Sequence, residues 1–181
     1  VDVEGGKALL LLSPSGESML VDAGNPGSNG RDADRIVEAC KAAGVKKIDY
    51  MVVTHYDGDH VANVPAVAER MPIVNYVDHG ENVQKYSAKS VDAYLALAAK
   101  AKRLVVKPGD EIPIKGFEAF VAMSAGKAIE KPLKGAGQPN PACETTPRKT
   151  WGADRRGFVD DHDTNENAMS IGLLVTYGKF R

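Results

Sequence analysis

The first half of the chain alternates short apolar runs with turn-forming residues. Apolar residues dominate Ala8–Ser13 and Ser18–Asp22, and Ser15 and Gly16 lie between the two runs. This pattern predicts two strands joined by a tight turn, which is a β-hairpin.

A helical period follows the hairpin. Apolar residues recur at helical spacing from near Asp32, where a helix is expected to begin, to Gly44, where a glycine ends it. We expect the apolar face of this helix to pack on a sheet, and that face is formed by Ile36, Val37, Cys40 and Ala43.

The next apolar run leads directly into a polar motif. A strand is predicted at Ile48–Val53, followed by the sequence THYDGDH, and a short helix is predicted within residues 61–72. Asn63 fits the N-cap of that helix, Pro65 is tolerated in its first turn and Pro72 ends it. The motif therefore lies in a strand-to-helix loop.

The second half continues this alternation and then loses it. Further elements are predicted at residues 73–77 (strand), 90–104 (helix) and 111–123 (two strands). Residues 124–167 are rich in glycine and proline, and we expect them to form a long, lid-like loop before a strand resumes within residues 168–180. No repeat or linker divides the chain, so a single α/β domain is expected over residues 1–181.

The composition fits one globular domain, or part of a larger one. The chain has 181 residues, of which 43% are hydrophobic and 26% charged. Its formal net charge is −1 and its basic residues are dispersed, so no field of one sign favours nucleic acid or a membrane surface. The longest apolar stretch, Ala8–Leu12, is far shorter than the roughly 20 residues of a membrane-spanning helix.

The cellular compartment stays open between a cytoplasmic and a periplasmic or secreted location. The chain begins without an initiating Met and without a charged-then-apolar leader, so a signal peptide was either removed or never present. Cys40 in the predicted helix and Cys143 in the predicted loop lack a CxxC spacing, and we expect two free thiols.

The polar motif gathers residues that can bind metal. His55, Asp57, Asp59 and His60 follow the buried strand, and Gly58 lets the backbone curl so that His60 can join from the next helix. Zinc and similar divalent ions bind imidazole nitrogen and carboxylate oxygen, and catalytic sites keep a position open to water. Two ions about 3.5–4 Å apart can hold a hydroxide for attack on a carbonyl or phosphoryl group. The pattern thus predicts a divalent metal, with zinc expected, and the alternative is a polar turn in which Asp59 caps the next helix.

The chain resembles the metallo-β-lactamase-fold hydrolases, whose motif THxHxDH follows a buried strand. THYDGDH departs from that motif, because Asp57 takes the place of the middle histidine. This variant resembles the branch related to the hydrolase domain of bacterial DNA-uptake (competence) channel proteins. The opening hairpin, which ends in a D-x-G, and the N-x-x-S within residues 165–180 resemble the same branch.

The resemblance implies an αββα four-layer sandwich and a metal-bound hydroxide as the nucleophile. Carried over by position, it assigns His55 and Asp57 to one metal and Asp59 and His60 to a second. Asp22 would support the site from below, and Asp59 or the metal-bound water would handle the protons.

The family pattern continues with a metal-bridging aspartate and a later histidine, which this sequence does not contain after its last predicted strand. We therefore expect the sandwich to be incomplete at the C-terminus, and a C-terminal fragment or a second chain to complete it. His79 and His162 are the remaining histidines and are candidates for additional ligands.

The function predicted from the sequence is metal-dependent hydrolysis of a small molecule or a phosphodiester. The motif does not separate a phosphodiester from a lactam or lactone substrate. The alternative is a non-catalytic binding or scaffolding module that retains the fold with an incomplete metal site. No membrane partner is expected.

Overall fold

The computed structural model describes residues 1–84, 87–134 and 165–180. Cys143 and the candidate ligand His162 lie outside these ranges, as does most of the predicted lid-like loop. The described Cys40 is a free, buried thiol, as predicted.

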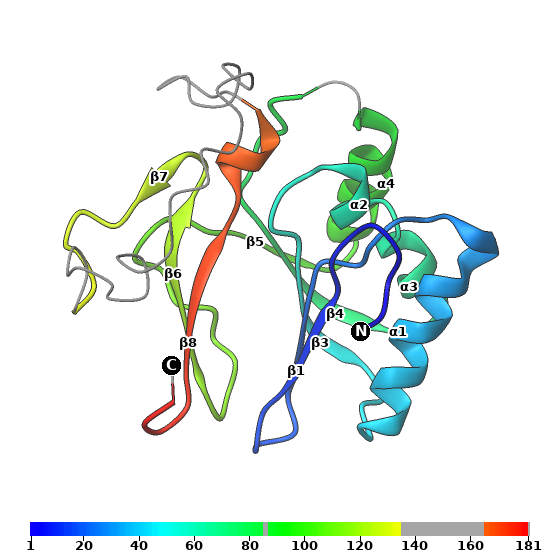
Figure 1. Ribbon diagram of the computed structural model, residues 1–181, viewed down its shortest axis with the longest axis horizontal. Coiled ribbons are helices and arrows are strands. Elements are labelled where there is room, and N and C mark those ends of the chain that lie inside the picture. The colour runs from blue at the N-terminus through cyan, green and yellow to red at the C-terminus, as the bar shows by residue number, and fades with distance from the viewer. Residues whose placement is uncertain (85–86, 135–164, 181) are drawn as a thin grey trace, which may run out of the picture.

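A five-stranded sheet forms the centre of the molecule (Figure 1). Its strands are β1 (Leu9–Leu12), β2 (Ser18–Val21), β3 (Ile48–Val52), β4 (Ile73–Asp78) and β5 (Lys102–Val105), which lie side by side in this order. β1 and β2 form the predicted antiparallel hairpin, and every later neighbour pairs in parallel. β2 and β3 are buried along their whole length, as expected for strands covered on both faces.

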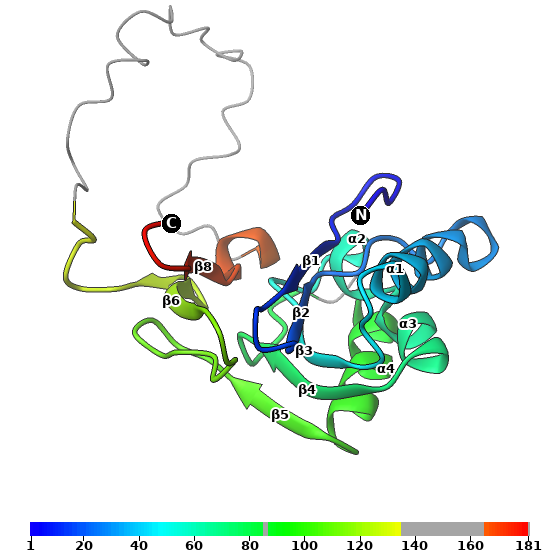
Figure 2. The ribbon, with the colours of Figure 1, turned by 90° about the horizontal axis from the view of Figure 1, so that it is seen from below.

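Helices cover one face of this sheet (Figures 1 and 2). They are α1 (Arg31–Ala42), α2 (Gly58–Val61), α3 (Val64–Arg70) and α4 (Ala88–Ala98), and the short 3-10 turn η1 (Ser28–Gly30) precedes α1. Ile36, Val37 and Cys40 of α1 are buried as predicted, whereas Ala43 is exposed because it lies just beyond the end of the helix.

A second sheet packs against the opposite face of the first (Figure 2). It consists of β6 (Glu118–Ser124), β7 (Lys127–Ala128) and β8 (Gly172–Thr176), paired antiparallel in the order β7-β6-β8, and the 3-10 turn η2 (Glu166–Met169) leads into β8. Met19 and Val52 of the first sheet share an apolar cluster with Val121 and Ile171. The α/β class is therefore confirmed: the described residues form a helix layer and two packed sheets, as in the metallo-β-lactamase type of sandwich.

Two predicted elements are wrong in part. The helix expected at residues 90–104 ends at Ala98, and Lys102–Val105 forms β5 instead. Alanine and lysine favour a helix locally, but pairing with β4 and the ion pair between Arg103 and Asp78 stabilise a strand. Of the two strands expected within residues 111–123, only β6 forms.

The first of those expected strands is reduced to an isolated bridge between Glu111 and Phe120. Pro113 follows closely, and a proline has no N–H with which to continue a ladder. No helix within the described ranges is long and apolar enough to span a membrane.

Candidate metal centre

The parallel strands place the polar motif at one edge of the central sheet (Figure 1). Asp22 follows β2, Thr54 and the rest of the motif follow β3, and Asp78 and His79 lie at the end of β4. In open parallel sheets the carboxyl ends of the strands are the usual place for ligands. Side chains far apart in the sequence therefore meet at this edge.

Within the motif, one helical turn brings the candidate ligands together. Asp57 has an extended backbone (φ −65°, ψ 146°) and precedes α2, in which the N–H of His60 donates to the Asp57 carbonyl at 2.9 Å. The turn places the His60 ring over the His55 ring, with centroids 3.9 Å apart. His60 thus reaches the other side chains from a helix, as the glycine at position 58 suggested.

The N-terminal arm lies against this turn. The backbone of Gly6 approaches the Asp59 carbonyl so closely that a Cβ at position 6 would collide with it. The N–H of Ala23, next to Asp22, donates to the His60 carbonyl at 2.9 Å. These backbone contacts tie the D-x-G loop and the chain's first residues to α2.

The four candidate ligands lie as two pairs. His55 Nε2 is 3.6 Å from Asp57 Oδ2, and His60 Nε2 is 3.6 Å from Asp59 Oδ2. These separations are too long for good hydrogen bonds. They are close to the roughly 3.3–3.4 Å expected between two donors on one tetrahedral zinc ion with bonds of about 2.0–2.1 Å. The resemblance assigns these same two pairs to two metal ions, and that assignment stays a prediction.

Two donors per ion are fewer than the three or four protein ligands of typical zinc sites. In the part of the chain that the structure describes, no group of three or more His, Cys, Asp or Glu side chains is gathered so that it could hold a metal ion. Further donors would therefore have to be water, substrate, a rearranged side chain or residues outside the described ranges, among them His162.

Asp22 is fully buried and connects the end of β2 to the motif. Its carboxylate accepts the Thr54 N–H at 2.7 Å and the Thr54 hydroxyl at 2.8 Å, and it lies 2.9 Å from His60 Nδ1. Its backbone has a φ of 60°, which is uncommon for a residue other than glycine but tolerated by aspartate. With Nδ1 bonded to the carboxylate, the Nε2 of His60 is left for another partner.

The hydrogen bonds of His55 determine which ring nitrogen carries the hydrogen. Nδ1 lies 3.1 Å from the Thr54 hydroxyl and 3.2 Å from the Ser170 hydroxyl. Each hydroxyl has one hydrogen: that of Thr54 goes to Asp22, and that of Ser170 goes to the Asn167 carbonyl at 2.8 Å. Both hydroxyl oxygens can therefore only accept, so the His55 hydrogen is on Nδ1 and the lone pair is on Nε2.

The Nε2 atom of His55 is a buried acceptor whose hydrogen-bonding capacity is not satisfied by the described residues. Among the described residues it is buried without a hydrogen-bond partner, in a side chain that is 6% exposed. A buried polar atom without a partner is costly, so such an atom marks a place for a ligand. Imidazole nitrogen beside carboxylate oxygen is a donor set that suits zinc, and these residues fit a divalent ion.

The two histidines of the motif titrate differently. Burial, and then the neighbouring His60, lowers the pKa of His55, which favours the neutral imidazole that can bind a metal. Burial also acts to lower the pKa of His60, but the hydrogen bond and charge of Asp22 outweigh it and raise that pKa. An ion at His60 therefore competes with a proton more strongly than an ion at His55.

His79, a candidate for an additional ligand, has other contacts. Its Nε2 lies 2.9 Å from Oε2 of Glu166, and its ring lies 4.6 Å from the ring of Tyr56. His79 and Glu166 are both buried. The structure thus places this nitrogen against a carboxylate from η2, while the role predicted for His79 stays a prediction.

Several contacts at the site were not assigned from the sequence. Thr54 bridges Asp22 and His55, and Asn167 Nδ2 donates to Asp57 Oδ2 at 3.1 Å. Asn167 and Ser170 are the first and last residues of the N-x-x-S stretch, and that resemblance is their one signal in the sequence. Glu166 has no local signal, because a glutamate in a polar segment is normally exposed.

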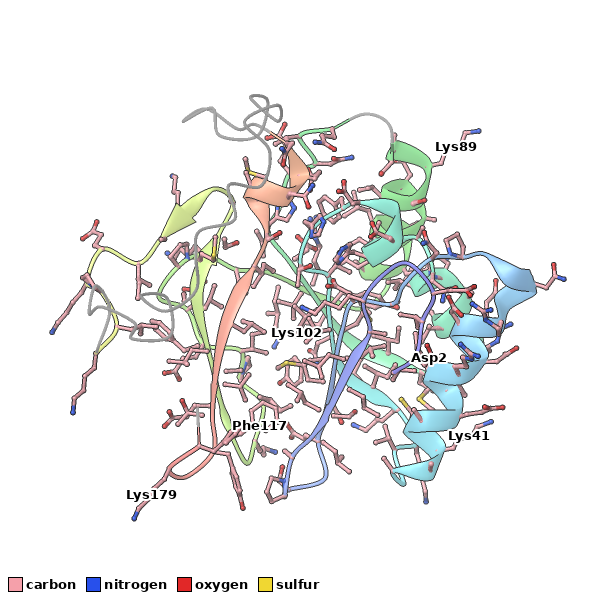
Figure 3. The ribbon with its side chains drawn as sticks, in the orientation of Figure 1. Asp2, Lys41, Lys89, Lys102, Phe117 and Lys179 are labelled. Carbon is pink, nitrogen blue, oxygen red and sulfur yellow. The ribbon has the colours of Figure 1, made fainter. Side chains whose placement is uncertain are left out.

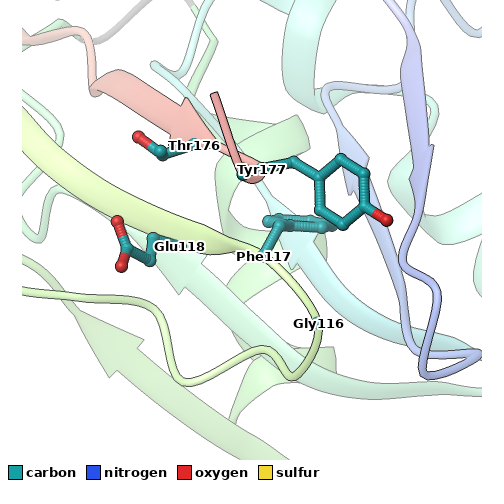
Figure 4. Close-up of a pocket in the computed structure, with 6 residues that line it drawn as sticks. Gly116, Phe117, Glu118, Thr176 and Tyr177 are labelled. Atoms are coloured by element: carbon teal, nitrogen blue, oxygen red, sulfur yellow. The ribbon is translucent and has the colours of Figure 1, made fainter. Parts of the chain in front are cut away.

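One hollow of the molecule lies far from the motif. A cavity of about 480 Å³ lies where β6 begins and β8 ends, at the end of the sandwich opposite to α2 (Figure 1), and Figure 4 shows the residues that line it. Phe117 and Lys179 are labelled near that end of the sandwich in Figure 3. The cavity is lined by Gly116, Phe117, Glu118, Thr176, Tyr177 and Gly178. None of the candidate ligands within the described residues contributes to it.

A helix layer on two packed sheets, with a motif of histidines and aspartates after a central parallel strand, places the chain among the layered α/β sandwiches. The family model of the metallo-beta-lactamase superfamily matches residues 2–138 of the chain. The chain belongs to this superfamily, whose members are usually metal-dependent hydrolases that bind divalent metals.

Several solved structures are similar to the chain at low sequence identity. Zn²⁺-bound PqqB from Methylobacterium extorquens is 16% identical, with a TM-score of 0.52, and the match covers 95% of this chain and 49% of PqqB. A metallo-beta-lactamase with an HARLDQ motif from Cronobacter sakazakii is 16% identical, with a TM-score of 0.44 and coverage of 65% and 47%. A diphosphatase of the PhnP family is 14% identical, with a TM-score of 0.40 and coverage of 67% and 45%.

At 16% identity the likeness to PqqB concerns the fold alone. The chain spans about half the length of these structures, 49% of PqqB and 47% of the Cronobacter protein. No curated protein matches the sequence significantly. The matches do not single out the DNA-uptake branch, which stays a prediction.

Proposed function

We propose that this chain is the metal-binding part of a metal-dependent hydrolase, with zinc as the expected ion and two ions in the complete site. His55 and Asp57 would hold one ion, and Asp59 and His60 the other. The observation that carries the proposal is the buried Nε2 of His55, which has no hydrogen-bond partner among the described residues and lies 3.6 Å from Asp57 Oδ2. Membership in a superfamily of usually metal-dependent hydrolases supports the reaction class.

The residues of the site would have separate tasks. When bound, the ions polarise the attacked carbonyl or phosphoryl oxygen and lower the pKa of a coordinated water to about 7. Asp59, whose side chain is 43% exposed, is accessible enough to take up and release a proton, and we propose it as the catalytic residue. Asp22 holds the Nδ1 side of His60 and thereby orients that ring.

The substrate class follows from what two cations can polarise, which includes a phosphodiester and a lactam or lactone. The alternative of a non-catalytic module is not favoured, because the chain retains both ligand pairs and the buried carboxylate behind them.

We also propose that a C-terminal fragment or a second chain packs beside β8. In the described part of the chain, β8 and β1 are edge strands of the two sheets. A hollow of about 140 Å³ beside Thr54 is lined mainly by apolar side chains of these strands, and Leu9 and Leu12 are 44% and 45% exposed. An added strand would cover this surface. A lone monomer by light scattering that binds no apolar dye would contradict this proposal.

The metal site is tested by metal content. The chain is stripped with a chelator, reloaded with zinc or manganese, dialysed and analysed by mass spectrometry. His60→Ala should retain less metal than the parent chain. Asp34→Asn is the control, because Asp34 is an exposed carboxylate of α1 that pairs with Arg70. Equal metal in His60→Ala and the parent would sink the proposal.

The reaction is tested with a generic phosphodiester, a lactam and a lactone. Activity should rise with pH through an ionisation at about 7, disappear with a chelator and return with zinc or manganese. Asp59→Asn should abolish it, since a charged ligand and a proton acceptor are lost together. Activity that resists chelation or ignores Asp59 would mean that THYDGDH is a polar turn.

A further inference from the structure

A short segment that leads into the second sheet lies along the motif of the first. This segment, residues 166–171, comprises η2 and the residues before β8 (Figure 1). The N–H of Ile171 donates to the Thr54 carbonyl at 2.9 Å, and Oε2 of Glu166 accepts the N–H of Tyr56 at 3.0 Å. The two ends of the 166–171 segment thus bond the backbone on either side of His55.

Between these ends, two side chains contact candidate ligands. The Ser170 hydroxyl lies 3.2 Å from His55 Nδ1, and Asn167 Nδ2 donates to Asp57 Oδ2 at 3.1 Å. Because the Ser170 hydrogen is used on the Asn167 carbonyl, its oxygen accepts the hydrogen of His55. One segment therefore contacts both side chains of the first ligand pair.

Glu166 anchors the segment in the interior. Its carboxylate is fully buried and accepts the N–H of Tyr56, accepts the N–H of Val83 at 2.6 Å and lies 2.9 Å from His79 Nε2. A buried carboxylate is stable only with such donors. Glu166 thereby joins η2 to the loops that follow β3 and β4.

We propose that Ser170 and Asn167 are positioning residues for the first metal position and that Glu166 fixes them in place. Ser170 keeps His55 in the Nδ1–H tautomer with the Nε2 lone pair available, and Asn167 orients the Asp57 carboxylate. Partners behind metal ligands act in this way. The part that concerns an ion rests on the proposed function, whereas the tautomer is a property of the metal-free protein.

The contacts predict graded effects. Ser170→Ala removes one acceptor of the His55 hydrogen and leaves the other, the Thr54 hydroxyl at 3.1 Å. The variant should therefore weaken metal binding without abolishing it. Asn167→Ala removes one hydrogen bond to the Asp57 carboxylate and should have a similar effect, and the double variant should bind zinc more weakly than either single variant.

Measurements of zinc affinity test whether the two variants bind metal more weakly. The full chain and its variants are titrated against a chromogenic chelator, and Ser170→Ala and Asn167→Ala should each bind zinc about 10–100-fold more weakly. Ser18→Ala is the matched control, because Ser18 is a buried serine at the other end of β2 whose hydroxyl donates to the Lys47 carbonyl at 2.9 Å. Its zinc affinity should equal that of the parent chain. Affinities of all variants within about twofold would overturn the proposal.

The tautomer of His55 tests the positioning role of Ser170 in the metal-free chain. Ring ¹⁵N shifts of the stripped parent chain should show His55 protonated on Nδ1, and Ser170→Ala should populate the Nε2–H form. The side-chain amide resonance of Asn167 should move in Asp57→Ala. Nε2–H in the parent chain, or an Asn167 resonance indifferent to Asp57, would overturn the assignment. If the parent chain binds no zinc while these shifts hold, the proposed function fails and the positioning contacts stand.

Discussion

Two buried aspartates at the same edge of the central sheet have carboxylates that are stabilised by different hydrogen-bond partners. Asp22 follows β2 and Asp78 ends β4, and both are fully buried. Asp78 accepts two hydrogen bonds from Arg103, from Nε at 2.7 Å and from Nη2 at 2.9 Å. Asp22 is bonded instead by the N–H and hydroxyl of Thr54 and by the ring of His60.

The charge of the Asp78 carboxylate is compensated by Arg103 of the same chain. A guanidinium stays charged at every relevant pH, and its hydrogen bonds to Asp78 raise the pKa of Arg103 further. The Tyr94 hydroxyl donates to the same carboxylate at 2.9 Å, and burial, followed by the charge of Asp78, raises the pKa of Tyr94. The group joins β4, α4 and β5 and is therefore structural.

The contacts of Asp22 do not neutralise the negative charge of its carboxylate. Its partners are a peptide, a hydroxyl and an imidazole, none of which is a permanent cation. A negative charge behind His60 strengthens that ring as a ligand. We propose that Asp78, which has its own arginine, stabilises the fold, whereas Asp22 orients His60 for the proposed ion.

The largest effect is expected on the Asp78 side of this comparison. Arg103→Met leaves Asp78 buried without its cation, so the free energy of unfolding should fall by about 3–5 kcal/mol, nearer the lower value because Arg103 is partly exposed. Urea unfolding measures this, and zinc content per folded molecule should not change. Arg35→Met is the control, because Arg35 pairs with the exposed Asp2 and should matter little. A loss of zinc from folded Arg103→Met would break the distinction between the two aspartates.

The next effect concerns Asp22. Asp22→Asn keeps the shape but removes the charge behind His60, and zinc affinity should fall about 10–100-fold. Chelator competition measures this, with Asp78→Asn compared at a temperature where both variants are folded. Zinc affinity in Asp78→Asn should match that of the parent chain. An equal loss in both variants would show that the two carboxylates act alike.

The smallest effect concerns a third buried carboxylate, Asp49, at the other end of β3. Burial acts to raise the pKa of Asp49, but the hydrogen bonds from Lys47 and Ser18 outweigh it and lower the pKa. The ionised form therefore stabilises the fold above the unfolded-state pKa, and this contribution is lost as pH falls through the lower, folded-state value.

Asp49→Asn should accordingly be slightly less stable than the parent chain at pH 7, by less than the Arg103→Met loss, since Lys47 is largely solvent-exposed. Thermal unfolding from pH 7 to pH 2 measures the difference, which should shrink steadily below about pH 4. Zinc affinity should stay unchanged throughout. A difference that grows on acidification would contradict the assignment.

Local pattern was enough for the elements that carry the motif. The hairpin, α1, β3 and β4 were predicted within one or two residues, because each combines a clear apolar period with a turn or cap at its ends. Asp22 was expected near the motif through the D-x-G resemblance, and the chain from Thr54 to His60 is continuous. Where two preferences compete, local pattern failed: the alanine-rich residues after Ala98 favour a helix, yet pairing with β4 stabilises β5.

What the sequence by itself determined is therefore the identity of the candidate ligands and the strand that presents them, since both depend on neighbours in the chain. Only the tertiary structure decided which residues contact His55 and its neighbour Tyr56 from the segment that leads into the second sheet. Glu166 meets Tyr56 across 110 positions, and Ser170 meets His55 across 115. Such contacts form only after the two sheets pack. Burial of a glutamate carboxylate is unfavourable unless hydrogen-bond donors already surround it. The hydrophobic periodicity of the sequence does not indicate these long-range contacts. The side chains that orient His55 and Asp57 can therefore be identified only in the folded chain.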